Sequence, residues 1–275
     1  MPARTPERIV CLTEESTETL YLLGEERRIV GISGYTVRPP RARREKPRVS
    51  AFLSARTEKI LELKPDLVIG FSDLQAEIAR DLTRAGLNVL IFNQRSVQEI
   101  LDMILALAAL VGARDKGLQL IGQLEAGLAE IRGAANRFAR KPKVYFEEWD
   151  EPMISGIRWV SELIEIAGGE DVFSAQSHSQ GATGRIVSDA NLVIRKNPDV
   201  ILGSWCGKKF RPERVAARPG WQAIAAVREN QLFEIKSADI LQPGPAALTD
   251  GVRQIHEILK RSSDRGSGTR SQAAG

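Results

Sequence analysis

The sequence has few cysteines, histidines and aromatic residues, and each shortage narrows the class of protein. Its 275 residues include two Cys, two His, four Trp, three Tyr and eight Phe. Cys11 and Cys206 can form one disulfide at most, which excludes a disulfide scaffold and is compatible with a reducing compartment. Two cysteines and two scattered histidines lack the ligand spacing of a zinc site, so we expect no bound metal.

Long hydrophobic runs are also missing. The most apolar segment, residues 100–113, carries Asp102 and is shorter than the roughly 20 residues that cross a bilayer. Charged residues are scattered through residues 1–30, so we expect no signal peptide. The sequence as given predicts a cytoplasmic protein with no membrane insertion, or a periplasmic one if a leader is missing from it.

Neither sign of charge dominates. Thirty-nine Lys and Arg face 35 Asp and Glu, for a net charge of +4, and six basic residues lie between Arg38 and Arg48. Away from that cluster the balance is near neutral, so we expect a small-molecule ligand and no nucleic acid. Hydrophobic residues at 43% and charged residues at 27% are typical of a packed globular chain.

Short apolar runs alternate with helical patterns along most of the chain. The runs predict strands at residues 8–12, 29–32, 66–70, 88–92, 143–146, 199–203 and 232–235. This alternation at βαβ spacing predicts an α/β fold with mainly parallel sheets covered by helices.

Between the two series of strands, residues 96–140 contain neither proline nor a strand pattern. Helical periodicity there predicts one long connecting helix of about 60 Å, which Gly112 would bend or interrupt. The expected organisation is therefore an N-terminal α/β lobe (1–95), a backbone helix (96–140), a C-terminal α/β lobe (141–260) and a disordered polar tail (261–275). Lys64-Pro65-Asp66 and Asn197-Pro198-Asp199 each end a helix before a strand, which supports two similar Rossmann-like lobes.

Several motifs carry a family resemblance. They are Lys64–Ile69, Ile32–Tyr35 with Pro39-Pro40, and Ser155-Gly156 followed by Ala167–Phe173. In these motifs and in its two-lobed pattern, the chain resembles the helical-backbone (class III) periplasmic binding proteins. Within them it is closest to cobalamin-binding proteins of ABC importers. The resemblance implies a non-catalytic, monomeric protein that needs no cofactor and holds a corrinoid in a cleft between its lobes.

In open α/β sheets, ligands bind beyond the carboxyl ends of the strands. Five of the 15 aromatic residues fall in these loops, namely Tyr35, Phe52, Phe71, Trp149 and Trp205. Their rings would stack on a flat ligand, and carboxylates would accept amide N–H groups. The expected ligand-binding residues are Thr13, Glu14, Tyr35, Phe52, Phe71, Glu148, Trp149, Met153, Arg185, Trp205, Cys206 and Gln242.

The resemblance also implies one acidic residue on each lobe that docks on arginines of a permease. Glu58 and Asp189 are the expected docking residues. Trp159 and Trp221, by contrast, lie in patterns typical of core packing.

Two alternatives remain open. In the first, the protein is the iron-siderophore or haem substrate-binding subunit of an ABC importer. Arg185 is the one arginine among several carboxylates in the loops, however, which favours a neutral or cationic ligand. In the second, the protein is an enzyme whose Cys206 thiol has a pKa lowered by nearby Lys208.

Overall fold

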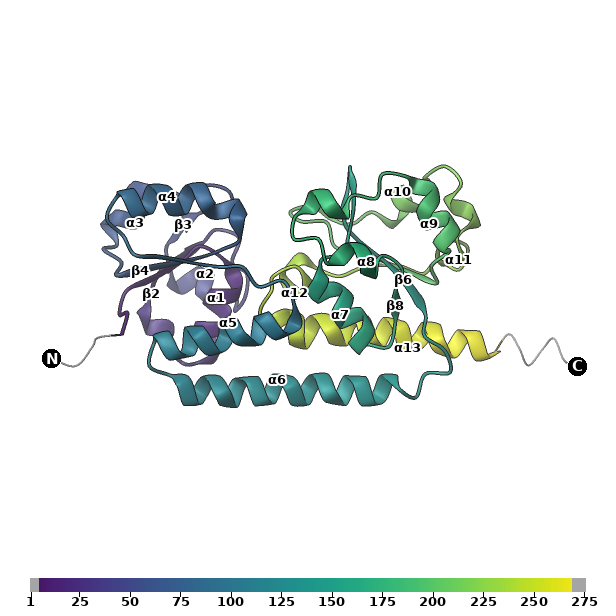
Figure 1. Cartoon of the computed structure of the whole chain (residues 1–275), viewed down its shortest axis with the longest axis horizontal. Helices are drawn as coiled ribbons and strands as arrows, with labels where there is room; N and C mark the ends of the chain where they lie inside the picture. The colour runs from purple at the N-terminus through teal and green to yellow at the C-terminus, as the bar shows by residue number, and fades with distance from the viewer. Residues whose placement is uncertain (1–4, 269–275) are drawn as a thin grey trace, which may run out of the picture. The chain divides into compact units, whose positions relative to one another are not determined.

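The computed structural model describes residues 5–268, which divide into two compact units (Figure 1). Unit 1 comprises residues 5–94, 98–124 and 242–245. Unit 2 comprises residues 95–97, 125–241 and 246–268. Each unit is an α/β structure with a mostly parallel sheet, which confirms the predicted fold class.

Unit 1 is built on a five-stranded sheet in the order β3-β2-β1-β4-β5, and every pairing in it is parallel. Its strands are β1 (Ile9–Cys11), β2 (Ile29–Ser33), β3 (Arg48–Ser50), β4 (Leu67–Phe71) and β5 (Val89–Phe92). Its helices include α1 (Glu14–Leu22), α2 (Ala42–Glu45), α3 (Thr57–Glu62) and α4 (Ala76–Arg84), with short 3₁₀ turns η1 (Glu26–Arg28) and η2 (Asp73–Gln75).

The central strands β1 and β4 are buried along their whole length, since helices cover both faces of a parallel sheet. Because all five strands run the same way, the loops that follow them meet at one edge of the sheet.

Unit 2 has its own five-stranded sheet, in which β10-β9-β6-β7 are neighbours and β8 pairs with β6. The β6–β7 pairing is antiparallel, and the remaining pairings are parallel. The strands are β6 (Lys143–Asp150), β7 (Met153–Ser155), β8 (Glu170–Asp171), β9 (Val200–Gly203) and β10 (Leu232–Glu234). The helices are α7 (Arg158–Ile166), α8 (Ser174–Ser177), η3 (Ala182–Arg185), α9 (Ala190–Lys196), α10 (Pro212–Ala216), η4 (Trp221–Ala223), α11 (Ala225–Arg228), α12 (Ser237–Ile240), the π-helix η5 (Ala247–Gly251) and α13 (Val252–Gly268).

The segment 96–140 forms two helices rather than one. Helix α5 (Val97–Leu110) ends and α6 (Arg114–Ala135) begins around Gly112, whose φ of +74° lies in the left-handed region. A glycine adopts this conformation at little cost and is common where a helix ends. Helix α6 then passes from unit 1 to unit 2 at Leu124–Glu125.

The prediction of a disordered tail at residues 261–275 is wrong for residues 261–268. Helix α13 runs on to Gly268, and Ser262 and Ser263 on it are buried, so packing continues the helix past the polar composition. Residues 269–275 lie outside the described residues.

All seven predicted strands are present within a residue or two of their expected bounds, except that β6 extends four residues further. Strands β3, β7 and β8 have two or three residues each, too few to show a hydrophobic period. Their existence depends on pairing with a neighbour.

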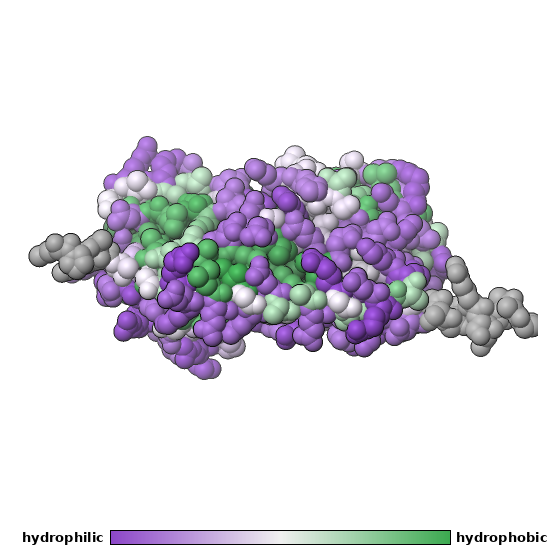
Figure 2. All heavy atoms as spheres, turned by 60° about the horizontal axis from the view of Figure 1, so that its bottom comes forward, coloured by the Kyte–Doolittle hydropathy of each residue, from purple (hydrophilic) through white to green (hydrophobic). Residues whose placement is uncertain are grey.

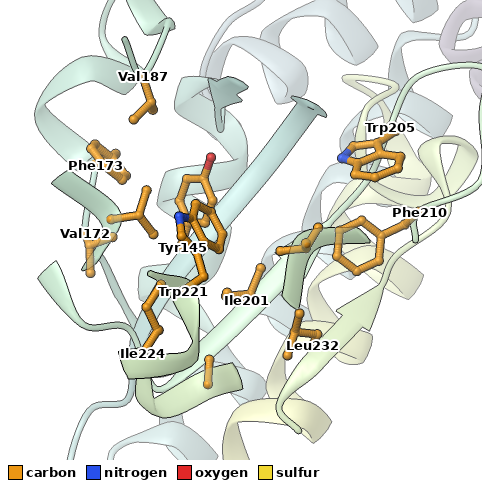
Figure 3. Close-up of a cluster of buried hydrophobic side chains, with 13 residues drawn as sticks. Tyr145, Val172, Phe173, Val187, Ile201, Trp205, Phe210, Trp221, Ile224 and Leu232 are labelled. Carbon is orange, nitrogen blue, oxygen red and sulfur yellow. The ribbon is translucent and has the colours of Figure 1, made fainter. Parts of the chain in front are cut away.

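An aromatic core stabilises unit 2 (Figure 3). The Tyr145 ring meets Trp221 and Phe173 edge-on, with ring centroids 6.1 Å and 5.4 Å apart, and Trp205 meets Phe210 at 5.1 Å. Trp221 is fully buried, and Trp159 is 3% exposed with its indole N–H donating to the Ile240 carbonyl. The predicted packing roles of Trp159 and Trp221 are confirmed.

Hydrophilic residues cover most of the face that Figure 2 turns to the viewer, with smaller hydrophobic patches between them. Within residues 5–268, no helix has both the length and the hydrophobicity needed to cross a membrane.

Substitution of Gly203 by alanine tests how tightly the core of unit 2 is packed. A Cβ at this position would lie 1.9 Å from the Phe210 ring. We expect Gly203→Ala to lower the free energy of unfolding by about 1–3 kcal/mol in urea titrations, since the ring must shift. Gly122→Ala on α6 is the control: its Cβ meets open space, and we expect a gain of about 0.5–1 kcal/mol. Equal effects of the two variants would contradict this packing.

Candidate functional site

The loops at the carboxyl edge of the unit 1 sheet carry exposed apolar side chains. Tyr35 after β2 is 65% exposed, Leu53 after β3 is 68% exposed and Leu74 after β4 is 59% exposed. We call these three residues the apolar rim. Tyr35 was expected at a ligand site, whereas Leu53 and Leu74 were missed because a single leucine in a loop carries no sequence signal of its exposure.

Gln75 ties two of these loops together. Its side chain accepts a hydrogen bond from the Phe71 backbone N–H (2.9 Å) and donates one to the Phe52 carbonyl (2.9 Å). Phe52 is partly buried, and Phe71 ends strand β4 with 7% of its surface exposed. The ring of Phe71 therefore belongs to the interior of unit 1 rather than to a loop, which corrects its expected role.

Ser72 holds the next turn in an unusual backbone conformation. Its φ of 66° and ψ of 167° fall in a region essentially restricted to glycine, where strain is often found at functional sites. Its backbone N–H donates to the Phe92 carbonyl (2.8 Å), and its hydroxyl accepts from the Leu74 N–H. These bonds fix the turn that carries Leu74 on the apolar rim.

Two glutamates at the start of α1 are almost completely buried at the same edge. Glu14 and Glu15 are 4% and 2% exposed. One oxygen of Glu14 accepts the Val37 N–H (2.5 Å), and one oxygen of Glu15 accepts the Thr13 hydroxyl (2.5 Å). The second oxygen of each carboxyl is buried without a hydrogen-bond partner. Thr13 is 3% exposed as well, so Thr13 and Glu14 are interior residues rather than parts of an exposed loop, which corrects their expected ligand contacts.

Burial without a paired cation changes the acidity of both groups. Desolvation raises the pKa of Glu14 to about 7, against hydrogen bonds from the backbone of Val37 and Arg38. Desolvation likewise raises the pKa of Glu15 to about 7, against the Thr13 hydrogen bond. A carboxyl removed from water favours its neutral form, so both groups are poised to titrate near neutral pH.

The segment 242–245 belongs to unit 1 and lies against α1. Gly244 is so close that a Cβ there would lie 2.5 Å from the Glu15 Cβ. The Gln94 amide donates to the Pro243 carbonyl (2.9 Å), and the Gln94 side-chain oxygen is buried without a partner. Gln242, an expected ligand residue, is partly exposed at the start of this segment.

The buried carboxylate of unit 2, Glu147, has a cation as its partner, unlike Glu14 and Glu15. Glu147 is fully buried in β6 and accepts two bonds from the Arg218 guanidinium, at 2.5 Å and 2.9 Å. The Trp205 indole N–H and the Tyr145 hydroxyl donate to it as well, each at 3.0 Å. A buried carboxylate with a bidentate arginine and two further donors is fully satisfied. The exposed loop expected at residues 147–153 is instead the β6–β7 hairpin.

Trp205 and Arg185 have structural roles, which corrects two expected ligand contacts. Trp205 is 2% exposed, because its ring packs on Phe210 and its N–H is used by Glu147. Both Nη atoms of Arg185 bind the Glu148 carboxylate, at 2.5 Å and 3.0 Å, and the Arg185 side chain is 3% exposed.

Trp149 keeps partial exposure beside a lysine. The Lys208 ammonium lies 4.0 Å from the centre of the Trp149 ring and 5.3 Å from that of Trp205, and it forms an ion pair with Asp150. The Trp149 N–H donates to the Glu151 carbonyl (2.8 Å), and Met153 packs partly buried on the core of this unit. One face of the Trp149 ring is thereby held by a cation–π contact.

Cys206 is exposed, yet its pKa is raised, by desolvation and by the Glu148 carboxylate. The lowered thiol pKa expected from Lys208 is therefore wrong. Within residues 5–268, no group of three His, Cys, Asp or Glu side chains is arranged to hold a metal ion.

The two expected docking residues differ. Glu58 is exposed near the start of α3. Asp189 caps α9 by accepting the Asn191 N–H (2.9 Å) and pairs with Arg195 (3.1 Å). The helix cap and the ion pair give Asp189 a structural role within unit 2.

Arg218 should be essential to the stability of unit 2. Arg218→Ala leaves Glu147 buried without its guanidinium, which we expect to cost about 3–5 kcal/mol of unfolding free energy. Arg214→Ala is the control, since Arg214 is 62% exposed and 3.7 Å from Asp150, and we expect under about 1 kcal/mol. Urea unfolding at pH 7 measures both, and a loss below 1 kcal/mol for Arg218→Ala would contradict the assignment.

Glu15→Gln should stabilise the protein in alkaline but not in acidic solution. The folded pKa of Glu15 is about 7 against an ordinary 4.5, so the folded state binds the proton more tightly, and stability falls as pH rises from 4.5 to 7. Glutamine cannot ionise, and we expect a gain of about 3 kcal/mol at pH 8 and almost none at pH 4.5. Thermal unfolding across this range, with exposed Glu58→Gln as control, measures the difference. An equal effect at both pH values would refute it.

Comparison with known proteins identifies the family of the chain and several relatives. The family model described as "Periplasmic binding protein" matches residues 9–238. The uncharacterized ABC transporter substrate-binding lipoprotein YvrC of Bacillus subtilis is 25% identical over 262 residues, covering 93% of this chain and 81% of that protein. The vitamin B12-binding protein of Vibrio cholerae is 28% identical over 264 residues, covering 92% of this chain and 89% of that protein.

Among solved structures, the periplasmic heme-binding protein BhuT in complex with two hemes aligns with a TM-score of 0.77. It is 23% identical and covers 93% of this chain and 98% of that one, a likeness of fold. Periplasmic solute-binding proteins are not catalysts, which confirms that the protein is non-catalytic. The alternative of an enzyme that uses the Cys206 thiol is therefore wrong. The chain is a substrate-binding protein and belongs to the periplasmic binding protein family.

Proposed function

We propose that this protein is the substrate-binding subunit of an ABC importer and that its ligand is a corrinoid. Two kinds of relative support the proposal, an ABC transporter substrate-binding lipoprotein and vitamin B12-binding proteins. The observation that carries the ligand class is the apolar rim of unit 1, in which Tyr35, Leu53 and Leu74 are each more than half exposed.

An exposed apolar rim suits a broad ring system. Each Å² of apolar surface removed from water contributes about 25 cal/mol, and an aromatic contact adds about 0.5–1.5 kcal/mol. Three large side chains on the loops after β2, β3 and β4 offer a wide surface to one flat ligand, although β1 separates β2 from β4 in the sheet. Isolated exposed leucines are ordinary, whereas a group of them on one edge indicates a binding surface.

Charge favours a ligand without carboxylates. An anionic ligand needs free guanidinium donors, and Arg185 directs both Nη atoms to Glu148. The amides on a corrin rim are neutral and both donate and accept hydrogen bonds. Trp149 and partly exposed Glu148 are the groups through which unit 2 would contact such a ligand, together with Met153 and Cys206.

The importer role needs a permease that recognises the protein. Glu58 is exposed on α3 and has no competing role in the described residues, so it is the docking residue we retain. Asp189 is the weaker choice, because it already caps α9.

Titration calorimetry with four ligands tests the ligand class. We expect cyanocobalamin and cobinamide to bind with micromolar or tighter Kd, and haemin and a ferric catecholate siderophore to bind at least tenfold more weakly. Tighter binding of haemin or the siderophore would replace the corrinoid by that ligand. Failure of all four to bind would overturn the proposed ligand class.

Trp149→Ala and Tyr35→Ala test the contacts separately in each unit. We expect each to weaken cyanocobalamin binding more than tenfold, about 1.4 kcal/mol, through loss of ring contact. Leu118→Ala on α6, 43% exposed and away from these loops, is the matched control and should bind as the wild type does. Circular dichroism verifies folding. Unchanged affinity in either ring variant would exclude that residue from the site.

A further inference from the structure

Two segments expected to contact the ligand rest on two adjacent carboxyl groups of unit 1. The Tyr35 loop is fastened where the Val37 N–H donates to Glu14 at 2.5 Å. The Gln242 segment is seated where Gly244 packs on the Glu15 side chain. Glu14 and Glu15 are consecutive residues, so one turn of α1 supports both segments.

The surroundings of these carboxyls contain little positive charge. Neither Glu14 nor Glu15 forms an ion pair with another described residue. Glu18, on the same helix, raises the pKa of both and is itself paired with Arg38 (3.0 Å). The buried thiol of Cys11 interacts electrostatically with Glu15 and with Lys46, the C-cap residue of α2. The segment 242–245 contributes no titratable group.

Three buried oxygens near these carboxyls favour the neutral form of both glutamates. One oxygen of each carboxyl and the side-chain oxygen of Gln94 are buried without a partner, and Gln94 holds the same segment through Pro243. A buried unpartnered oxygen is tolerable on a neutral acid but very costly on a charged one. Ionising both groups places two like charges side by side in the interior.

We infer that Glu14 and Glu15 are positioning residues whose neutral forms hold the Tyr35 loop and the 242–245 segment in the ligand-binding arrangement, so that ligand binding is linked to protonation. The inference rests on the proposed function. Ionisation above neutral pH would release both segments, because water must then reach the charged carboxylates. The bound state therefore takes up protons.

The expected size follows from the fraction of protein in the competent form. If binding needs one carboxyl neutral and that carboxyl titrates near pH 7, affinity falls about tenfold between pH 6 and pH 8. If it needs both, the fall approaches a hundredfold.

Calorimetry with cyanocobalamin at pH 6, 7 and 8 tests the linkage. We expect wild-type affinity to fall by tenfold or more over this range. Glu14→Gln and Glu15→Gln keep an oxygen that accepts from Val37 or Thr13 but cannot ionise. Each should flatten the pH profile, and the double variant should bind at pH 8 as the wild type binds at pH 6. Exposed Glu62→Gln, on α3, should keep the wild-type profile. At pH 7, the binding enthalpies measured in phosphate and in Tris should differ. The two buffers have different ionisation enthalpies, and the buffer supplies the protons that the bound state takes up.

A pH-independent wild-type affinity, or Gln variants that keep the wild-type slope, would overturn the inference while leaving the proposed function intact. Hydrogen exchange of the free protein makes the test independent of the ligand. After correction for intrinsic rates, peptides covering 34–38 and 240–246 should lose protection from pH 6 to pH 8 in the wild type and keep it in the double variant. Equal protection at both pH values would overturn the inference even if no corrinoid binds.

Discussion

Parallel strand pairing is the constraint on which the site of unit 1 depends. Five strands run in one direction, so their following loops come to one edge whatever their sequences. Hydrogen bonds then connect the loops: Gln75 joins the loop of Phe52 to the end of β4, and Ser72 joins the loop of Leu74 to the end of β5. The sheet gathers the residues, and a few polar side chains set their spacing.

Buried glutamates show how the same residue type takes two roles. Glu147 accepts four hydrogen bonds, two of them from the Arg218 guanidinium, and these bonds join the strands and loops of unit 2. Glu14 and Glu15 each have one bound oxygen and one unpartnered oxygen, and burial raises their pKa to about 7. The number of donors within reach separates the fully hydrogen-bonded carboxyl of Glu147 from the two carboxyls whose pKa is raised by burial.

Side-chain roles were harder to predict than elements, for a physical reason. Carboxylates around Trp149 suggested an exposed loop, but Arg218 and Arg185 reach them from positions 71 and 37 residues away in the chain. A charge that finds a distant partner is buried at moderate cost, and no local pattern reveals that partner. The same reason explains Trp205, whose N–H is used by Glu147 inside the core.

Hydrophobic periodicity and turn residues by themselves determined the seven main strands, the mainly parallel sheets and the packing of Trp159 and Trp221, while a few short motifs carried the family resemblance. These features follow from local spacing and from short motifs, which a linear sequence records in full. Tertiary structure alone decided that Phe71, Trp205 and Arg185 are interior residues, that Leu53 and Leu74 are exposed, and that Glu15 is buried beside Gly244. Burial and ion pairing depend on residues distant in the chain, and those meet only once the sheets are formed.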